Sequence, residues 1–494
     1  MKVLLVTTSF EDCHRSSSVQ QNSHYPLGIA YLHSYLEKHQ HQVETLFLND
    51  YPFQECFDKI REALTTFKPD YVGFNILTPN RTSSFKLIEH IHENYQCKIL
   101  IGGIHVTVMY EQILQKYPFL IAVIGEGEQT TRELLEASSN GLSLRSIKGI
   151  AFVDNGIVTK TEARELIEDL DSLPFPKHEI FFSEARTMGN LLTSRGCPFK
   201  CSFCVLDRVS QQRVRYRSVN NVVDEIEYMV KAFPQLQTIW IHDDNFFLKN
   251  QRAVEICEEI VRRGIQKRFI CSGRFKPFTK ELVEALEKAG FVQILFGLES
   301  GSETILNSCH KCITRKDVID ALKLLRKSRI EATAFLIVGL YGENDQTVRE
   351  TIDFVKTMQK VKYTYYDDIG VILTYPGTEI YEIARKNGMI DDSYWLTPGE
   401  TPIFVVEHSE EKLTEYKRQI LDSIALRRFF SLTGFVRQLD MVPHIIRYAL
   451  KGSYYSRVNV LRAIARAMPG FVQSFVNRAV GSIPVGVKNL IRKI

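Results

Sequence analysis

Short apolar runs alternate with helical patterns over residues 1–140. The runs KVLLVT, QVETLFL, YVGFNIL, KILIGG and IAVIGEG predict buried strands, and segments such as LGIAYLHSYLEKH between them place apolar residues three or four positions apart. This alternation indicates a parallel sheet with helices on both faces. Five strands predict a flavodoxin-like, doubly wound domain, whose ligand crevice lies at the carboxyl ends of the strands.

Residues 141–188 break this alternation. The segment GIAFVDNGIVTK predicts a β-hairpin with Asn155 and Gly156 in its turn, because this dipeptide readily adopts the left-handed conformations of a two-residue turn. The following DSLPFPKHE contains two prolines, which disfavour regular structure. We interpret this region as a linker that docks two domains.

The alternation resumes over residues 189–385. Six strands are predicted from NLLTS, TIWIHD, RFICSGRF, VQILFGLE, ATAFLIVGL and DIGVILTY, with helical patterns between them. Six strand–helix units predict a partial (β/α)6 barrel of the triosephosphate-isomerase type, with functional groups at the C-terminal ends of its strands. Residues 386–494 have helical periodicity and no persuasive strand pattern, so the chain is predicted as an α/β protein with a helical C-terminal region.

The composition is that of a soluble globular protein. Hydrophobic residues make up 44% and charged residues 24%, and 494 residues suffice for two or three domains. No apolar run is long enough to cross a bilayer, and the N-terminus predicts a buried strand and not a signal peptide. Ten cysteines are too few for a disulfide scaffold, so we expect a cytoplasmic protein.

The net charge of +4 conceals an asymmetry. Residues 441–494 contain nine basic residues and no Asp or Glu, which leaves residues 1–440 with a net charge of −5. Such a tail favours an anionic partner surface. Arg462 and Arg466 share one face of a predicted helix, which suits either peripheral contact with membrane lipid or a helix packed on the barrel with a solvated basic face. No nucleic-acid-binding module is recognisable, so nucleic acid is not expected as a partner.

Three cysteines follow the first predicted barrel strand. The stretch RGCPFKCSFC places Cys197, Cys201 and Cys204 at the spacing C-x3-C-x2-C, with no fourth cysteine nearby. Three thiolates can bind three irons of a 4Fe–4S cluster and leave the fourth iron open to another ligand. A structural zinc ion needs a fourth Cys or His, and the nearest later histidine is His242. The spacing therefore favours such a cluster over zinc and over cysteines without a shared role.

This motif, with an aromatic residue before its last cysteine, resembles the radical S-adenosylmethionine (SAM) superfamily. The resemblance implies that the open iron binds SAM and that electron transfer cleaves SAM to methionine and a 5′-deoxyadenosyl radical. Further matches follow in the expected order: IHDDNFF, SGRF, FGLESGSETIL, LIVGLYGEN and TYPGT, with Tyr341 where proline is common. The residues that the resemblance assigns to cofactor binding are Phe203, Asp243, Asp244, Asn245, Arg274, Glu299, Ser300 and Gly339.

A flavodoxin-like domain before such a barrel resembles the cobalamin-dependent branch of the superfamily, on the matches YPLGIAYLHSYLEKHQHQVE, IGGIHVT and GEGE. The resemblance implies a bound cobalamin, although a domain that keeps the fold without cobalamin is an alternative. DCHRSS nearly matches the Asp-x-His-x-x-Gly signature of cobalt-ligating histidines, but Ser17 replaces glycine, so His14 is either a ligand or a solvated loop residue. The glycines that would let a flat ligand approach the strand ends are Gly102, Gly103, Gly125 and Gly127.

The resemblance leaves three alternatives for function. The first is a methyltransferase, in which the radical abstracts hydrogen from an unactivated carbon, methylcobalamin supplies the methyl group and a second SAM restores it. The second is a radical SAM enzyme without methyl transfer, such as the ring-forming or oxidising relatives of tetrapyrrole and hopanoid pathways. The third is a cobalamin-binding sensor, which the intact three-cysteine motif disfavours.

The expected partners are a small-molecule or lipid-like substrate and a reductant such as flavodoxin or ferredoxin. Cys309 and Cys312 form a second C-x-x-C. We interpret this spacing as incidental and not as a redox or cluster site.

Overall fold

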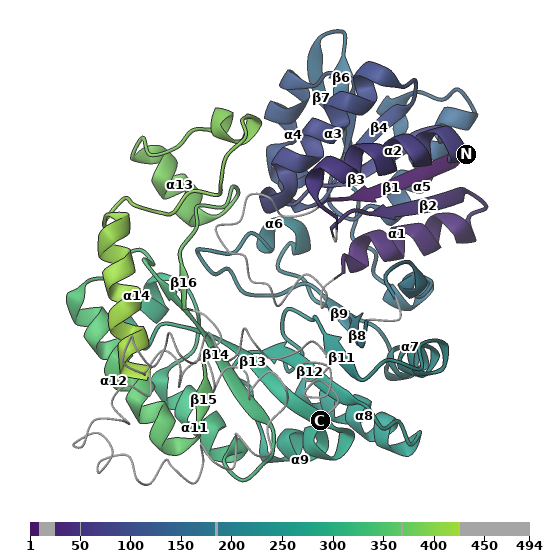
Figure 1. Cartoon of the computed structure of the whole chain (residues 1–494). Coiled ribbons are helices and arrows are strands. Elements are labelled where there is room, and N and C mark those ends of the chain that lie inside the picture. Colours follow the sequence, from purple (N-terminus) through teal and green to yellow (C-terminus); the bar gives the residue numbers. More distant parts are fainter. Residues whose placement is uncertain (9–24, 50, 183–185, 367–368, 425–494) are drawn as a thin grey trace, which may run out of the picture.

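The computed structural model describes residues 1–8, 25–49, 51–182, 186–366 and 369–424. Two sheets of mainly parallel strands, each covered by helices, lie one above the other in the view of Figure 1. The predicted α/β class and the predicted order of a doubly wound unit followed by a barrel are confirmed.

The N-terminal sheet contains the five parallel strands that the sequence predicts. In spatial order they are β2 (Gln42–Phe47), β1 (Lys2–Thr7), β3 (Tyr71–Asn75), β4 (Lys98–Gly102) and β5 (Leu120–Val123). The helices are α1 (Leu27–Lys38) and α5 (Glu128–Ser139) on one face and α2 (Phe53–Phe67), α3 (Arg81–Asn94) and α4 (Ile104–Lys116) on the other. Along β1, Val3 and Leu5 pack against the first pair, whereas Leu4 and Val6 pack against the other three. The strand is therefore apolar on both faces, as in buried parallel sheets.

The predicted hairpin is present and extends this sheet. Strand β6 (Ile150–Asp154) pairs antiparallel with β5, and β7 (Ile157–Lys160) pairs antiparallel with β6. The turn residues Asn155 and Gly156 have φ of 49° and 79°, the left-handed values of a two-residue hairpin turn. Residues 141–188 thus add two strands to the N-terminal sheet besides joining the two units. The domain boundaries at residues 140, 188 and 385 stay predictions.

The second sheet is an open barrel of parallel strands. In spatial order these are β8 (Met188–Leu191), β11 (Thr238–Ile241), β12 (Arg268–Gly273), β13 (Phe291–Glu299), β14 (Glu331–Val338) and the short β15 (Thr364–Tyr365), while β16 (Ile369–Val371) also pairs with β14. The outer helices are α7 (Val219–Ala232), α8 (Asn250–Arg262), α9 (Lys280–Ala289), α11 (Arg315–Leu325) and α12 (Asp345–Val361). Alternate strand residues such as Ile294 and Phe296 belong to the core beneath these helices. The predicted partial barrel is confirmed, but the sheet has seven strands and not six, because two short strands, β15 and β16, both pair with β14 where the sequence predicts the single strand DIGVILTY.

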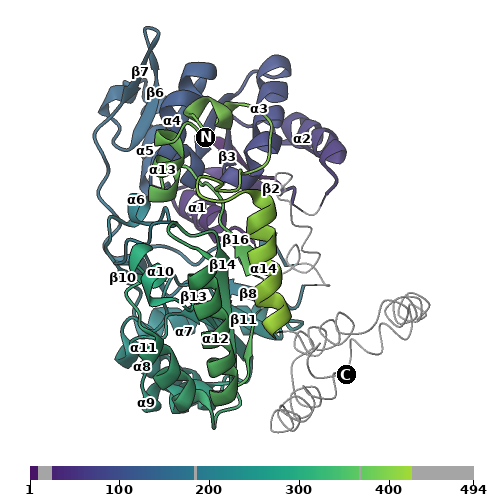
Figure 2. The ribbon, with the colours of Figure 1, turned by 90° about the vertical axis from the view of Figure 1, so that its left-hand side faces the viewer.

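After the barrel, the chain returns to the N-terminal unit. Helix α13 (Glu379–Lys386) and the 3₁₀ segment Asp392–Leu396 lie beside α4, and α14 (Glu410–Ile424) then packs against α12 and β16 (Figure 2). Trp395 is fully buried in the core that also contains Leu4 and Phe74 of the N-terminal sheet. The two units therefore share one hydrophobic core and do not pack as separate globules.

Within the described part of the C-terminal region, the 3₁₀ segment and α14 are helical, whereas residues 397–409 between them are not. Arg462, Arg466 and the whole basic tail lie outside the described residues. Of the helices that the structure describes, none has both the length and the apolar composition needed to cross a bilayer.

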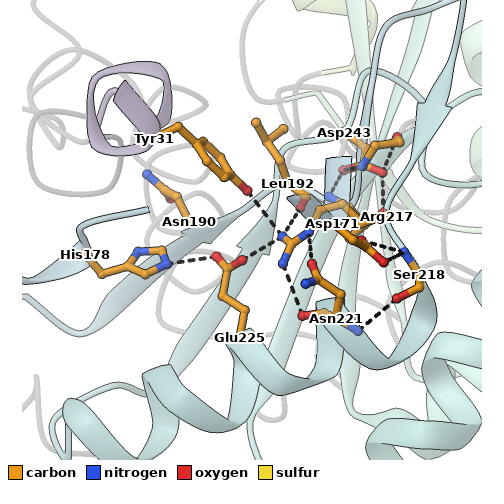
Figure 3. Close-up of polar contacts among 12 residues, drawn as sticks. Tyr31, Asp171, His178, Asn190, Leu192, Arg217, Ser218, Asn221, Glu225 and Asp243 are labelled. Atoms are coloured by element: carbon orange, nitrogen blue, oxygen red, sulfur yellow. Dashed lines mark hydrogen bonds and ion pairs between the residues drawn. The ribbon is translucent and has the colours of Figure 1, made fainter. Parts of the chain in front are cut away.

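Buried charges also connect the two units (Figure 3). Glu225 on α7 is fully buried, with His178 Nε2 2.9 Å from its Oε1 and Arg217 Nη1 2.6 Å from its Oε2. His178 Nδ1 is 2.7 Å from the Tyr25 hydroxyl, and Arg217 donates to the Tyr31 hydroxyl on α1 at 3.3 Å. Because a buried carboxylate is tolerated only with partners, this chain of contacts fixes α1 against the barrel.

Candidate active site

The three cysteines lie in the loop that follows the first barrel strand. A ribbon of β9 (Ser194–Arg195) and β10 (Arg215–Tyr216) closes the ends of this cysteine loop, residues 196–214, which contains the short helix α6 (Asp207–Ser210). Gly196 has a φ of 98°, and a Cβ there would lie 2.1 Å from the carbonyl oxygen of Arg213, so the position requires glycine. The sequence does not predict the ribbon, because strands of two residues carry no periodicity.

The donor set of the loop is compatible with a cluster. Cys197, Cys201 and Cys204 are free and partly buried. Burial raises the pKa of Cys197 and raises that of Cys204 to about 11, so both thiols need nearby cations to ionise at neutral pH. Across the described ranges, no three Cys, His, Asp or Glu side chains surround a point where one metal ion could bind. A cluster has a different requirement, because each cysteine binds its own iron.

Buried hydrogen-bond donors lie beside this loop. Arg274 follows β12, with its Nη1 3.9 Å from Cys201 Sγ and its Cζ 3.9 Å from the centre of the Phe199 ring. Within the described part of the chain, Arg274 Nε, Arg274 Nη2 and Asn245 Nδ2 are buried and have no hydrogen-bond partner. Unpaired buried donors are unfavourable. These atoms therefore fit an acceptor that the protein does not supply, such as the carboxylate of SAM.

Glu299 ends β13 in a left-handed conformation. Its φ is 67°, and the pairing register with β14 shifts between Gly297 and Glu299. Its Oε1 accepts a hydrogen bond from Lys311 Nζ at 2.7 Å. A Cβ at Gly297 would lie 2.5 Å from that oxygen, so the absence of a side chain there makes room for the ion pair. Gly297 alternates with Phe296 of the outer core, which places the pair on the inner face of the barrel.

Three of the predicted cofactor residues have contacts within the protein that hold the ends of the barrel strands. Asp243 accepts four hydrogen bonds of 2.5 to 3.2 Å from the two residues before Arg195. The Ser300 hydroxyl is 3.1 Å from the Thr351 hydroxyl on α12. Gly339 has a φ of 90° and packs closely against α14. These contacts hold the strand ends in place, and the assignment of the three residues to cofactor binding stays a prediction.

A cavity of about 380 Å³ lies between the two units. Its walls come from the carboxyl ends of the N-terminal strands on one side and from the cysteine loop and the end of β11 on the other. All four predicted glycines line it: Gly102, Gly103, Gly125 and Gly127. His242 and Asp244 line it from the barrel. One cavity thus reaches both the predicted cobalamin site and part of the cysteine loop, through Gly196 and Leu206, whereas the three cysteines themselves are not among its lining residues.

The four glycine positions differ in how strictly the backbone conformation and the neighbouring atoms require a glycine. Gly103 has a φ of 102°, and a Cβ there would lie 2.6 Å from the Ile76 carbonyl oxygen. Gly125 has a φ of 79° with open space around the Cβ position. At Gly102 the nearest atoms would be those of Val123 at 3.8 Å, which is ordinary contact. Gly103 is therefore required by the fold, whereas Gly102 keeps the cavity wall flat.

Two neighbouring aspartates take different positions. Asp243 binds the strand ends, whereas Asp244 lines the cavity and accepts a hydrogen bond from the Gly196 amide at 3.2 Å. Burial, with the charge of Asp243 close by, raises the pKa of Asp244 to about 6. The IHDD motif thus supplies one structural carboxylate and one that faces the shared cavity.

Two glutamates of the GEGE motif bind arginines from the ends of the cysteine loop. Arg195 on β9 is 3.0 Å from Glu126 Oε1 and 2.7 Å from Glu128 Oε1, and Arg215 on β10 is 2.8 Å from Glu126 Oε2. Burial acts to raise the pKa of Glu126, but the hydrogen bond from Arg215 and the charge of Arg195 hold it below its ordinary value. We call these four residues the arginine–glutamate clamp. The clamp was not predicted from the sequence, although the two acidic residues within GEGE and the arginine just before the cysteine motif could have suggested it.

The remaining predicted residues are placed as follows. Phe203 is partly buried beside the core that the two units share. Cys309 is buried and Cys312 is exposed, both are free, and they lie in a turn between α10 (Glu303–Ser308) and α11. His14 lies outside the described residues.

The fold and the site together define a class of enzyme. An open barrel whose first strand leads into three cysteines shares a cavity with a doubly wound domain, as expected of a radical SAM enzyme that uses cobalamin. Residues 191–355 match the radical SAM superfamily, and residues 18–135 match the B12 binding domain. The chain is 30% identical over 438 residues, 86% of this chain and 93% of the relative, to an uncharacterized methyltransferase, PH0819, of Pyrococcus horikoshii. The chain therefore belongs to the radical SAM superfamily, in the branch with a B12-binding domain.

Relatives of this chain differ in their reactions. The anaerobic magnesium-protoporphyrin IX monomethyl ester cyclase of Rubrivivax gelatinosus is 29% identical over 374 residues, which cover 71% of this chain and 65% of the cyclase. A solved structure of the cobalamin-dependent SAM radical enzyme OxsB with aqua-cobalamin and SAM bound has the same fold, with a TM-score of 0.71 at 19% identity over 97% of this chain and 80% of that one. The cofactors of this enzyme class are a 4Fe–4S cluster, SAM and cobalamin.

The clamp predicts a stability effect at the junction. Glu126→Gln removes the carboxylate that binds both arginines and leaves the buried Arg215 without its charged partner, so we expect the free energy of unfolding to fall by about 3 kcal/mol at pH 7. Urea unfolding of the protein without cofactors measures this. Since the pKa of Glu126 is depressed in the fold, its contribution is present above about pH 4.3 and is lost as the pH falls further. The difference between wild type and variant should therefore shrink in acid.

The matched control is Glu162→Gln, which breaks an ion pair with Lys148 in which the glutamate side chain is 72% exposed. We expect a change below about 1 kcal/mol. Equal effects of the two substitutions would contradict the assignment of the clamp.

The cavity predicts different effects for two adjacent glycines. Gly102→Val adds a side chain to the cavity wall, with its Cβ in ordinary contact with Val123, so we expect cobalamin affinity to fall roughly tenfold or more, with a stability change below about 1 kcal/mol. Gly103→Ala forces a strained backbone and a collision with Ile76, so we expect a loss of about 1–3 kcal/mol of stability. Absorbance titration with hydroxocobalamin and urea unfolding separate the two. A Gly102→Val protein with wild-type affinity would show that cobalamin does not use this wall.

Proposed function

We propose that the enzyme transfers a methyl group, through cobalamin, to an unactivated carbon of a small-molecule or lipid-like substrate. The observation that carries the proposal is the cavity that joins the B12-binding domain to the cysteine loop, because methyl transfer needs both cofactors to reach one substrate. The 30% identity to an uncharacterized methyltransferase over most of both chains supports it.

The residues present fit the cofactors as follows. Cys197, Cys201 and Cys204 would bind the cluster, which supplies the electron for SAM cleavage. Arg274 and Asn245 would donate to the SAM carboxylate through their buried donors, and Glu299 would accept from SAM. The strand-end glycines would bind cobalamin, the methyl donor.

The protein itself would hold the cofactors and the substrate in position and exclude water from the cavity. The cavity walls are mainly apolar, with residues such as Leu5, Phe74 and Leu192 facing a few polar groups, including Asp244. Such walls keep water from a reactive carbon-centred intermediate. The clamp holds the cysteine loop against the B12-binding domain, so the two cofactor sites keep a fixed separation.

A second candidate is ring formation or oxidation without methyl transfer. The 29% identity to the anaerobic cyclase of Rubrivivax gelatinosus favours it, and the same barrel would begin the reaction. A reductant such as flavodoxin or ferredoxin would serve either reaction. A lipid-like substrate would suit peripheral membrane contact through the basic tail.

Product analysis tests the proposal. We expect the anaerobically purified protein, loaded with cobalamin and given SAM, reductant and substrate, to release both S-adenosylhomocysteine and 5′-deoxyadenosine. Two SAM molecules have different fates in such a reaction, one as methyl donor and one as radical source. Quantifying both products by chromatography distinguishes the candidate functions. Release of 5′-deoxyadenosine alone would favour ring formation or oxidation. Release of neither product would exclude both candidate functions.

The cluster assignment predicts that Cys201→Ala loses the brown iron absorbance and SAM cleavage together. The matched control is Cys97→Ala, because Cys97 is a partly buried free thiol just before β4, in the other unit. It should keep the iron and the activity. Continued SAM cleavage by the Cys201→Ala protein would overturn the assignment.

A further inference from the structure

One turn joins the cysteine loop to the end of β13. Residues 309–312, between α10 and α11, contact the middle of the cysteine loop through two backbone carbonyls. The Ser202 amide donates to the Cys309 carbonyl at 3.2 Å, and Cys201 Sγ is 3.8 Å from the His310 carbonyl oxygen. The turn therefore supports the loop next to one of the proposed cluster ligands.

Lys311 lies in the middle of this turn and is buried. Its Nζ is 2.7 Å from Glu299 Oε1, and both side chains are only 8% exposed. The same Nζ is 6.0 Å from the centre of the ring of Phe203, which belongs to the cysteine loop. Lysine is strongly hydrated and is rarely buried without a partner, so its position between Glu299 and the loop needs an explanation beyond packing.

The backbone around Lys311 is built to hold this position. His310 and Cys312, on either side of it, both have a φ of 54°, a left-handed value that is unfavourable for residues other than glycine. The Lys311 amide donates to the Leu306 carbonyl at 2.9 Å, and the Cys309 side chain is buried in the shared core. Strain at two positions in one turn indicates that the surroundings determine the direction of the lysine side chain.

We propose that Lys311 is a positioning residue for SAM: it holds one oxygen of Glu299 and so fixes the direction in which this carboxylate meets SAM beside the cluster. The proposal rests on the assignment of Glu299 to SAM under the proposed function. It gives the C-x-x-C segment a role in which the lysine between the cysteines, and not their thiols, acts on the cofactor site.

The experiment compares Lys311→Met, Lys311→Arg and the control Lys316→Met in the reconstituted, reduced enzyme. Lys316 lies in the first turn of α11 with its side chain 85% exposed, paired only with Asp320 among the described residues. We measure 5′-deoxyadenosine formation against SAM concentration, together with the iron content and the SAM-induced change in the electron paramagnetic resonance spectrum of the cluster. SAM cleavage needs no methyl acceptor, so it can succeed where methyl transfer fails.

We expect Lys311→Met to keep its iron and to raise the KM for SAM roughly 10- to 100-fold, with a smaller change in kcat, because a supporting contact is lost. Lys311→Arg should recover most of the affinity, since it keeps a cation beside Glu299, and Lys316→Met should behave as wild type. Glu299→Gln should add little to Lys311→Met, because both act on one contact. An unchanged KM in Lys311→Met, an iron loss that Lys311→Arg does not reverse, or additive effects of the two substitutions would each overturn the proposal.

Discussion

The arrangement of the active site depends on charges buried at the junction of the two units. Arg195 and Arg215 lie directly before and after the cysteine loop, and both form ion pairs with glutamates that follow β5. In a medium of low dielectric constant, either partner alone would be strongly unfavourable. Separating the partners is therefore costly, so the pairs strongly favour one relative placement of loop and sheet. A reaction that uses a cofactor from each unit needs such a placement, because small errors in distance greatly reduce the rate.

Hydrophobic contacts at the same junction also hold the two units together, besides the buried charges. Trp395 and Tyr381, from the segment after the barrel, are buried in the core of the N-terminal sheet. Interfaces of this kind restrict domain motion, whereas polar interfaces within a chain permit it. The segment that closes the barrel thus also fastens the B12-binding domain. The cavity between the units is therefore bounded by parts of the chain that pack against one another through this core.

Many strands and helices of the fold have a local sequence pattern of apolar and polar residues, and these elements were predicted correctly from the sequence. Apolar runs and helical periodicity identify the five N-terminal strands, the hairpin and the barrel strands from β8 to β14, because each is long enough to show its period. The ribbon of β9 and β10 is too short for this. The clamp and the Glu299–Lys311 pair join residues that are distant in sequence, or lie on different elements, and no local pattern reports such contacts. Adjacent Asp243 and Asp244 look equivalent in sequence, and only the structure separates the carboxylate that ties the strands from the one that lines the cavity.

The cysteine loop is held at separate points by unrelated interactions. The clamp fixes its ends through ion pairs, whereas the turn at residues 309–312 supports its middle through backbone carbonyls. Loops between strands are ordinarily mobile, and a loop that must present three thiols to one cluster cannot be. Fixing the ends sets the distance to the B12-binding domain, and supporting the middle sets the distance to Glu299. The position of the cysteine loop therefore determines the distances between the proposed cofactor sites, although these sites lie on different elements of the fold.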